Sequence, residues 1–237
     1  VDKAGFLKEW LLLGPFAVDG DPSSFPGIRT QYPPEAEGVD TAKSYPTAAG
    51  KSVWKRVISD NDIIDLRGQF QPSDKAVAFA ACWVISSDKN SRKAILAIGS
   101  GDGCKIWWNG EPVITALEMR PAAPRQNAAV VTVNPGANLI LVKVENGFGE
   151  WGFMAELADE RGESPLGMVG FTTTPPEKGA GSGNPPAAGA GPKDDLERKV
   201  EALGKNVQAL REDLDGVKEI LAELDRLGGE SSGELKK

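Results

Sequence analysis

The sequence predicts a mainly β protein: a jelly-roll β-sandwich, then a Pro/Gly/Ala linker and a C-terminal coiled-coil helix. Two patterns predict this arrangement. The first part of the chain consists of short apolar runs separated by turn residues, which is typical of a β-sandwich. The last part places apolar residues at heptad spacing, which is typical of a coiled coil. The expected boundaries are residues 1–173 for the sandwich, 174–193 for the linker, 194–227 for the helix and 228–237 for a disordered tail.

Seven apolar runs are the predicted strands. They occupy residues 10–13, 77–85, 94–98, 104–108, 129–133, 138–145 and 151–157. We expect the first of them to stop at Gly14-Pro15, and the fourth to enter a hairpin at Asn109-Gly110, the strongest short hairpin signal. Residues 18–50 are mostly irregular, and we expect a long loop packed across the sandwich.

Several motifs occur in a familiar order along these runs. WLLLGPF starts at residue 10 and YPPE at residue 32, followed by GSGDGCKIWWNG from residue 99 and GANLILVKVENGFGEWGF from residue 136. In this order they resemble the galactose-binding-like jelly-roll domains of secreted multidomain proteins of planctomycetes and related bacteria. A looser similarity runs to the protective-antigen-type sugar-binding sandwiches. The resemblance covers roughly residues 9–160 and implies a sandwich and a secreted or cell-surface bacterial location, whereas function does not follow from fold.

Composition excludes several classes of function. The chain has 237 residues and a net charge of −7, which argues against nucleic acids and anionic membrane surfaces as partners. It has no apolar run long enough to span a membrane. It also contains no histidine, and so lacks the usual base near neutral pH and the commonest metal ligand. With no distinctive acid–base motif present, we expect neither enzymatic activity nor a cofactor.

The cysteines and the first residue bear on the cellular compartment. Cys82 and Cys104 lie in two predicted strands, so they form a disulfide if those strands are neighbours in an oxidising compartment, or remain two buried free thiols. The chain begins at Val1, which fits removal of a secretory signal and equally an artificially shortened chain.

Aromatic residues near polar ones are the candidate carbohydrate-binding residues. Alternation along 104–108 places Cys104, Ile106 and Trp108 on the core face, and Lys105 and Trp107 on the other face. Trp107 beside Lys105 then either stacks on a sugar ring or packs beneath the 18–50 loop. Trp151 likewise either closes the core or stands at the rim beside Arg120 and Glu150.

Three aspartates are weak candidates for metal binding. Asp102 follows a glycine where the resembled domains often carry a second aspartate, which leaves one carboxylate for a calcium ion that needs six to eight oxygens. Asp19 and Asp21 also form an oxygen-rich stretch. All three fit ordinary turns, in which aspartate accepts hydrogen bonds from backbone N–H groups. The prediction is therefore no metal.

The C-terminal segment carries a strict 4-3 apolar spacing over about four heptads. A seam this narrow needs a partner helix, whereas a helix packed on its own domain usually shows a wider apolar face. Self-association is favoured; packing on the chain's own sandwich or docking into another protein stays open. The seam consists of Leu196, Val200, Leu203, Val207, Leu210, Leu214, Val217, Leu221 and Leu224.

Two functions fit these patterns. In the first, a non-catalytic extracellular structural protein oligomerises through its C-terminal helix into a fibre, a surface layer or a similar assembly. In the second, the same helix makes a carbohydrate-binding module multivalent, with a cell-surface or matrix polysaccharide as its partner. The first is favoured from the sequence.

Overall fold

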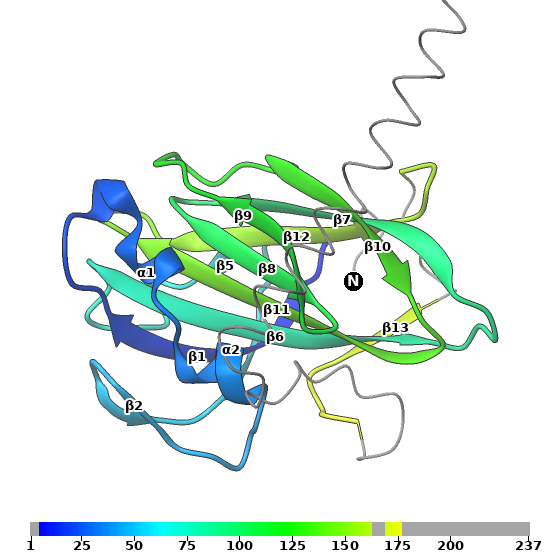
Figure 1. Cartoon of the computed structure of the whole chain (residues 1–237), viewed down its shortest axis with the longest axis horizontal. Helices are drawn as coiled ribbons and strands as arrows, with labels where there is room; N and C mark the ends of the chain where they lie inside the picture. The colour runs from blue at the N-terminus through cyan, green and yellow to red at the C-terminus, as the bar shows by residue number, and fades with distance from the viewer. Residues whose placement is uncertain (1–4, 163–168, 177–237) are drawn as a thin grey trace, which may run out of the picture. The chain divides into compact units, whose positions relative to one another are not determined.

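A computed structural model describes residues 5–162 and 169–176, and these residues form a β-sandwich of two antiparallel sheets (Figure 1). The larger sheet has the order β4-β1-β6-β11-β8-β9, with β13 also beside β6, and the smaller has the order β10-β7-β12-β5. The larger sheet comprises β1 (Glu9–Ala17), β4 (Lys55–Ile58), β6 (Ala76–Ser86), β8 (Cys104–Trp108), β9 (Glu111–Ala116), β11 (Gly136–Asn146) and β13 (Val169–Thr172). The smaller comprises β5 (Ile64–Asp65), β7 (Arg92–Ser100), β10 (Asn127–Val133) and β12 (Gly152–Ala158). The mainly β prediction is confirmed for the described residues.

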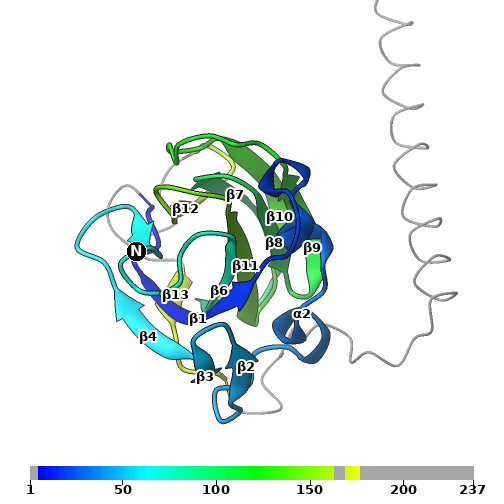
Figure 2. The same cartoon turned by 90° about the vertical axis from the view of Figure 1, so that its left-hand side faces the viewer.

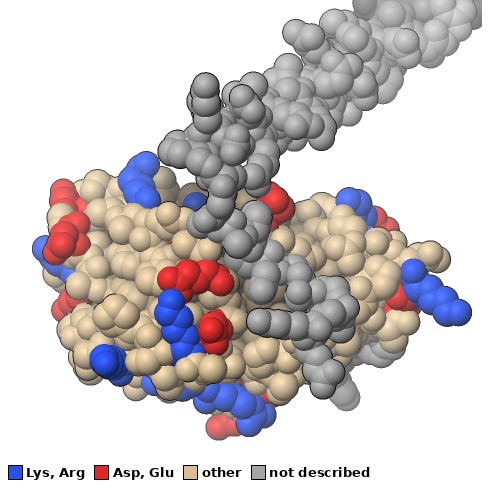
Figure 3. Space-filling view, turned by 60° about the horizontal axis from the view of Figure 1, so that its bottom comes forward, with Lys and Arg blue, Asp and Glu red and all other residues tan. Residues whose placement is uncertain are grey.

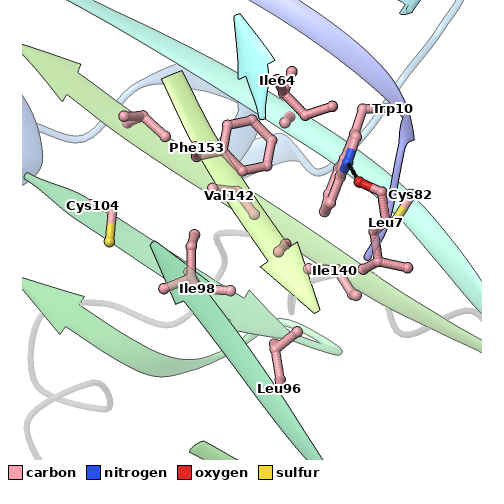
Figure 4. Close-up of a cluster of buried hydrophobic side chains, with 14 of the residues drawn as sticks. Leu7, Trp10, Ile64, Cys82, Leu96, Ile98, Cys104, Ile140, Val142 and Phe153 are labelled. Carbon is pink, nitrogen blue, oxygen red and sulfur yellow. Dashed lines mark hydrogen bonds between the residues drawn. The ribbon is translucent and has the colours of Figure 1, made fainter. Parts of the chain in front are cut away.

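The core lies between the two sheets and follows the alternation of the strands. Ile140 and Val142 of the larger sheet share one cluster with Leu96 and Ile98 of the smaller (Figure 4). Cys104, Ile106 and Trp108 belong to this cluster too, whereas Trp107 lies in a second cluster, so the faces predicted for β8 are confirmed.

The two cysteines face this core but cannot pair. Cys82 lies opposite Ile140 of β11, and Cys104 lies opposite Val144 of the same strand, so β11 separates them and they are offset by four residues along it. Figure 4 shows them on opposite sides of the cluster. Bridged cysteines need Cα atoms within about 7 Å, so both remain free, buried thiols.

The strand that begins near Trp10 is longer than predicted. β1 continues through Gly14 to Ala17, and its pairing with β6 shifts between Leu13 and Phe16. Gly14-Pro15 therefore marks a bulge within the strand and not its end. The Asn109-Gly110 hairpin is confirmed: both residues have positive φ, as a two-residue type I′ turn requires.

The outer face of the larger sheet is also apolar. The segment between β1 and β4, residues 18–54, covers this face and is called the cover below. Short elements interrupt this segment: η1 (Pro22–Ser24), α1 (Pro26–Arg29), α2 (Pro33–Glu37), β2 (Tyr45–Thr47) and β3 (Gly50–Ser52). Figure 2 shows α2, β2 and β3 outside the larger sheet. Tyr45 and Trp54 of the cover pack with Phe79, Trp83 and Leu141 of the sheet in the second cluster. The prediction that residues 18–50 pack across the sandwich is therefore confirmed.

The described surface carries mixed charge. On the face shown in Figure 3, basic and acidic side chains are interspersed and not gathered by sign. Among the helices that the structure describes, none has the length and apolar character needed to cross a bilayer.

The predicted C-terminal segments lie almost wholly outside the described residues. Of the linker 174–193, residues 174–176 are described, and the helix 194–227 and the tail 228–237 are not.

Candidate functional site

A pocket of about 390 Å³ opens where β7 ends and β12 begins. Three exposed polar side chains line it, together with apolar groups and a buried indole. The lining residues are Asn61, Ile63, Asp65, Gly101, Pro121, Ala122, Glu150, Trp151 and Gly152. They come from four separate chain segments, so folding of the sandwich is what brings them together.

Trp151 fixes the wall of the pocket from inside the core. Its side chain is 2% exposed and packs against Phe70, with ring centroids 6.0 Å apart. Its carbonyl oxygen accepts hydrogen bonds from the N–H groups of Leu66 and Arg67 at 2.9 and 3.1 Å. These bonds hold the chain that follows β5 against the start of β12. Trp151 therefore closes the core and at the same time lines the pocket.

A close backbone approach positions the opposite wall. A Cβ atom on Gly99 would lie 1.6 Å from the carbonyl oxygen of Ala123. Because Gly99 has no side chain, the segment that contains Ala123 can lie against the smaller sheet. The backbone N–H of Ser100 donates to the side chain of Gln126 at 3.0 Å, which fixes the same segment. Pro121 and Ala122 reach the pocket as a result.

The pocket combines the two kinds of contact that a polyhydroxylated ligand uses. The carboxylates of Asp65 and Glu150 and the amide of Asn61 can bond to hydroxyl groups. Ile63 and Pro121 offer apolar surface to the C–H face of a ring. No basic side chain is among the residues that line it.

Two of the other three predicted carbohydrate-binding residues, Trp107 and Lys105, do not line the pocket and lie on β8 of the larger sheet. Trp107 is 8% exposed, in the cluster beneath the cover, and Lys105 places its ammonium 4.9 Å from the centre of the Trp107 ring. Burial in this cluster and the Lys105 ammonium therefore leave the ring without an open face on which a sugar could stack. The four candidates do not form one site, and of the four only Trp151 lines the pocket.

Arg120 stands beside the pocket without lining it. Its guanidinium forms bonds to Glu118 and Asn127, and its carbonyl oxygen accepts from the N–H of Asp102 at 3.0 Å. These contacts hold the chain around Arg120, between β9 and β10, in place.

Two of the three weak metal candidates have structural partners. Asp102 has positive φ, is 9% exposed, and accepts from the N–H of Gly147 at 3.0 Å. Asp21 accepts from the N–H of Ser23, a hydrogen bond that lowers the pKa of its carboxyl. Asp19 is exposed. Within the described ranges, no three Cys, Asp or Glu side chains gather as a metal site would need.

A buried ion pair that the sequence did not predict fastens the cover to the larger sheet. The Nζ atom of Lys143 on β11 donates to Oε1 of Glu35 on α2 at 2.6 Å and to the carbonyl oxygen of Thr30 at 2.9 Å. The side chain of Lys143 is 0% exposed and that of Glu35 is 8% exposed. The rings of Tyr32 and Phe79 lie 5.3 and 5.9 Å from Nζ.

Burial shifts the ionisation of this cluster. Loss of solvation lowers the pKa of Lys143, and Glu35 partly opposes that shift. Loss of solvation also raises the pKa of Tyr32 to about 12, with the charges of Glu145 and Glu35 adding to it.

A second carboxyl, Glu145, faces the same side of β11 two residues further on. It is buried, and its Oε2 accepts from the N–H of Ile28 at 2.7 Å. Its Oε1 atom is buried without a hydrogen-bond partner among the described residues. Loss of solvation raises the pKa of Glu145, and the bonds from Ile28 and Gly27 offset part of the rise.

The comparisons with known proteins yield distant structural similarity. No family model matches the chain, and neither does any curated protein. The chain is similar to a PA14 domain of the MpAFP antifreeze protein, at 14% identity and a TM-score of 0.32, covering 65% of each chain. It is also similar to a β-glucosidase from Kluyveromyces marxianus in complex with glucose, at 14% identity and a TM-score of 0.38, covering 51% of this chain and 17% of that one.

A third similar structure is a glycosyl hydrolase family 2 member from Bacteroides cellulosilyticus, at 12% identity and a TM-score of 0.37. The match covers 64% of this chain and 20% of that one. The chain thus spans a minor part of these two hydrolases.

Proposed function

We propose that the described sandwich is a non-catalytic carbohydrate-binding module, with its ligand in the pocket between β5, β7 and β12. The observation that carries the proposal is the composition of that pocket: exposed carboxylate and amide groups beside Ile63, Pro121 and Trp151. Hydroxyl groups of a sugar need such acceptors, and the faces of its ring need apolar surface. A volume of about 390 Å³ is in the range of pockets that bind small ligands.

The two carboxylates of the pocket also set its electrostatic preference. Asp65 and Glu150 face the same space with no basic side chain in the lining. A neutral or amino sugar therefore suits the pocket better than a uronic acid or a sulfated sugar, since like charges repel.

A glycan array tests this proposal with the intact chain. Glu150→Ala and Asn61→Ala remove exposed side chains of the pocket and leave the core untouched. Each is expected to weaken binding about tenfold, the effect of losing roughly 1.4 kcal/mol. Glu111→Ala, an exposed carboxylate on β9, is the matched control. Binding that survives both pocket substitutions, or no binding to any glycan, would contradict the proposal.

A second candidate function is assembly, favoured by the nine heptad positions from Leu196 to Leu224. In this proposal the helix joins copies of the chain outside the cell, into a fibre, a surface layer or a small oligomer that gives weak sugar sites avidity. Light scattering of the intact chain against a chain that ends at Thr174 tests it. A monomeric mass for both would exclude self-association.

A further inference from the structure

We propose that the buried ion pair between Lys143 and Glu35 is the precursor of an intramolecular amide, formed when the lysine amine condenses with the glutamate side-chain carboxyl and releases water. The bond would join β11 to α2 across 108 positions of the chain and fasten the cover permanently to the sheet. The proposal stands apart from the carbohydrate site.

The two reacting groups are in contact and buried. The Nζ atom of Lys143 lies 2.6 Å from Oε1 of Glu35, and both side chains are buried, at 0% and 8% exposed. Groups held in such contact react with effective concentrations far above those reached in solution.

The surroundings supply a driving force. Burying two opposite charges carries a desolvation cost that their mutual attraction repays only in part. Three aromatic rings lie within 6 Å of Nζ, those of Tyr32, Phe79 and Trp107. Condensation replaces two buried charges with one neutral amide and releases a water molecule, so the apolar setting favours the product over the ion pair.

The neighbouring groups act on both members of the pair. The N–H of Tyr32 donates to Oε1 of Glu35 at 3.2 Å, which polarises the carbonyl that Nζ would attack. Glu145 is buried on the same face of β11, one of its oxygens has no hydrogen-bond partner among the described residues, and its negative charge acts on the Lys143 ammonium.

The step balances without any other reactant. The lysine ammonium carries three protons and the glutamate carboxylate two oxygens. Nitrogen bonds to the Cδ carbon of Glu35, while the bond from Cδ to Oε2 breaks. Two of the three protons leave with Oε2 as water, and the third stays on the amide nitrogen. Oε1 becomes the amide oxygen and keeps its bond from Tyr32 N–H.

Mass spectrometry of the intact wild-type protein tests the proposal directly. The expected mass is lower than the sequence mass by one water, about 18 Da, and digestion should yield a branched peptide that joins residues 35 and 143. A protein of full sequence mass, with both peptides recovered in linear form after prolonged incubation of the folded protein, would overturn it.

Three variants sharpen the test. Glu35→Gln should form the same amide and lose ammonia, about 17 Da, so that its product equals the wild-type product in mass. Lys143→Arg should keep its full sequence mass. Lys105→Arg, the matched control over the same Trp107 ring, should still lose water. Water loss in Lys143→Arg, or its absence in Lys105→Arg once that variant is folded, would contradict the assignment.

Discussion

Lys143 and Glu35 lie 108 positions apart in the chain, yet they form an ion pair at 2.6 Å in the interior. The pair joins a central strand of the larger sheet to the segment that covers its outer face. The protein is thus layered in two directions from β11: one core faces the smaller sheet, and another faces the cover.

Removal of the lysine should destabilise the fold strongly. In Lys143→Met, the carboxylate of Glu35 remains buried without its partner, and we expect a loss of about 3–5 kcal/mol in the free energy of unfolding. Chemical denaturation measures it. The double variant Lys143→Met/Glu35→Gln should recover part of the loss, since it leaves no unpaired charge. An unchanged denaturation midpoint in Lys143→Met would show that the pair does not hold the cover.

The buried Glu145 should make stability depend on pH. Because its pKa in the folded protein is raised above the ordinary 4.5, the folded state binds this proton more tightly than the unfolded state. Stability is therefore lost as pH rises from 4.5 through the folded pKa.

Glu145→Gln removes this dependence. Relative to wild type, the variant should gain stability between pH 4.5 and neutral pH, as urea denaturation at several pH values would show. Glu111→Gln, on the exposed edge strand β9, controls for the loss of one negative charge. A constant difference between wild type and Glu145→Gln across this range would contradict the assignment.

The two cysteines should stay reduced and unreactive in the folded protein. Burial raises the pKa of the Cys82 thiol, and burial is also the main reason for the raised pKa of Cys104. A thiol reagent under native, oxidising conditions should label neither, and should label both after unfolding. If neither cysteine is labelled in unfolded, unreduced protein, the two form a disulfide, and the arrangement of β6, β8 and β11 must differ from the one described.

Gly99 should be required for the pocket. In Gly99→Ala the new Cβ would overlap the carbonyl of Ala123, so the segment that carries Pro121 and Ala122 must move. We expect a loss of about 1–3 kcal/mol in stability together with weaker ligand binding. Gly170→Ala, whose Cβ would meet its nearest neighbour at 3.9 Å, is the control and should behave as wild type.

Local patterns predicted the strands and the hairpin because each depends on neighbouring residues. Alternation along 104–108 placed Trp108 in the core and Trp107 on the opposite face, and Asn109-Gly110 specified its own turn. The prediction that the first strand ends at Gly14-Pro15 was wrong, because glycine and proline occur both at strand ends and at bulges within strands.

Such local patterns could not predict the pocket or the ion pair, because the residues of each are far apart in the sequence. A lysine within an apolar strand gives no sign of its partner, and Glu35 lies in a segment that reads as irregular. Asp65 and Glu150 likewise come together only through the pairing of β5 with β12. The one available signal was the strand from 138 to 145, whose outward face carries Lys143 and Glu145 after two apolar residues.

The measurement that tests the carbohydrate site most directly is NMR of the six indole N–H signals during titration with the best glycan from the array. Trp151→Phe and Trp107→Phe assign the two relevant signals. If the ligand occupies the proposed pocket, the Trp151 signal shifts in proportion to saturation, and the signal of the covered Trp107 stays in place. A shift of Trp107 with Trp151 unchanged would contradict the account and move the site to the outer face of the larger sheet.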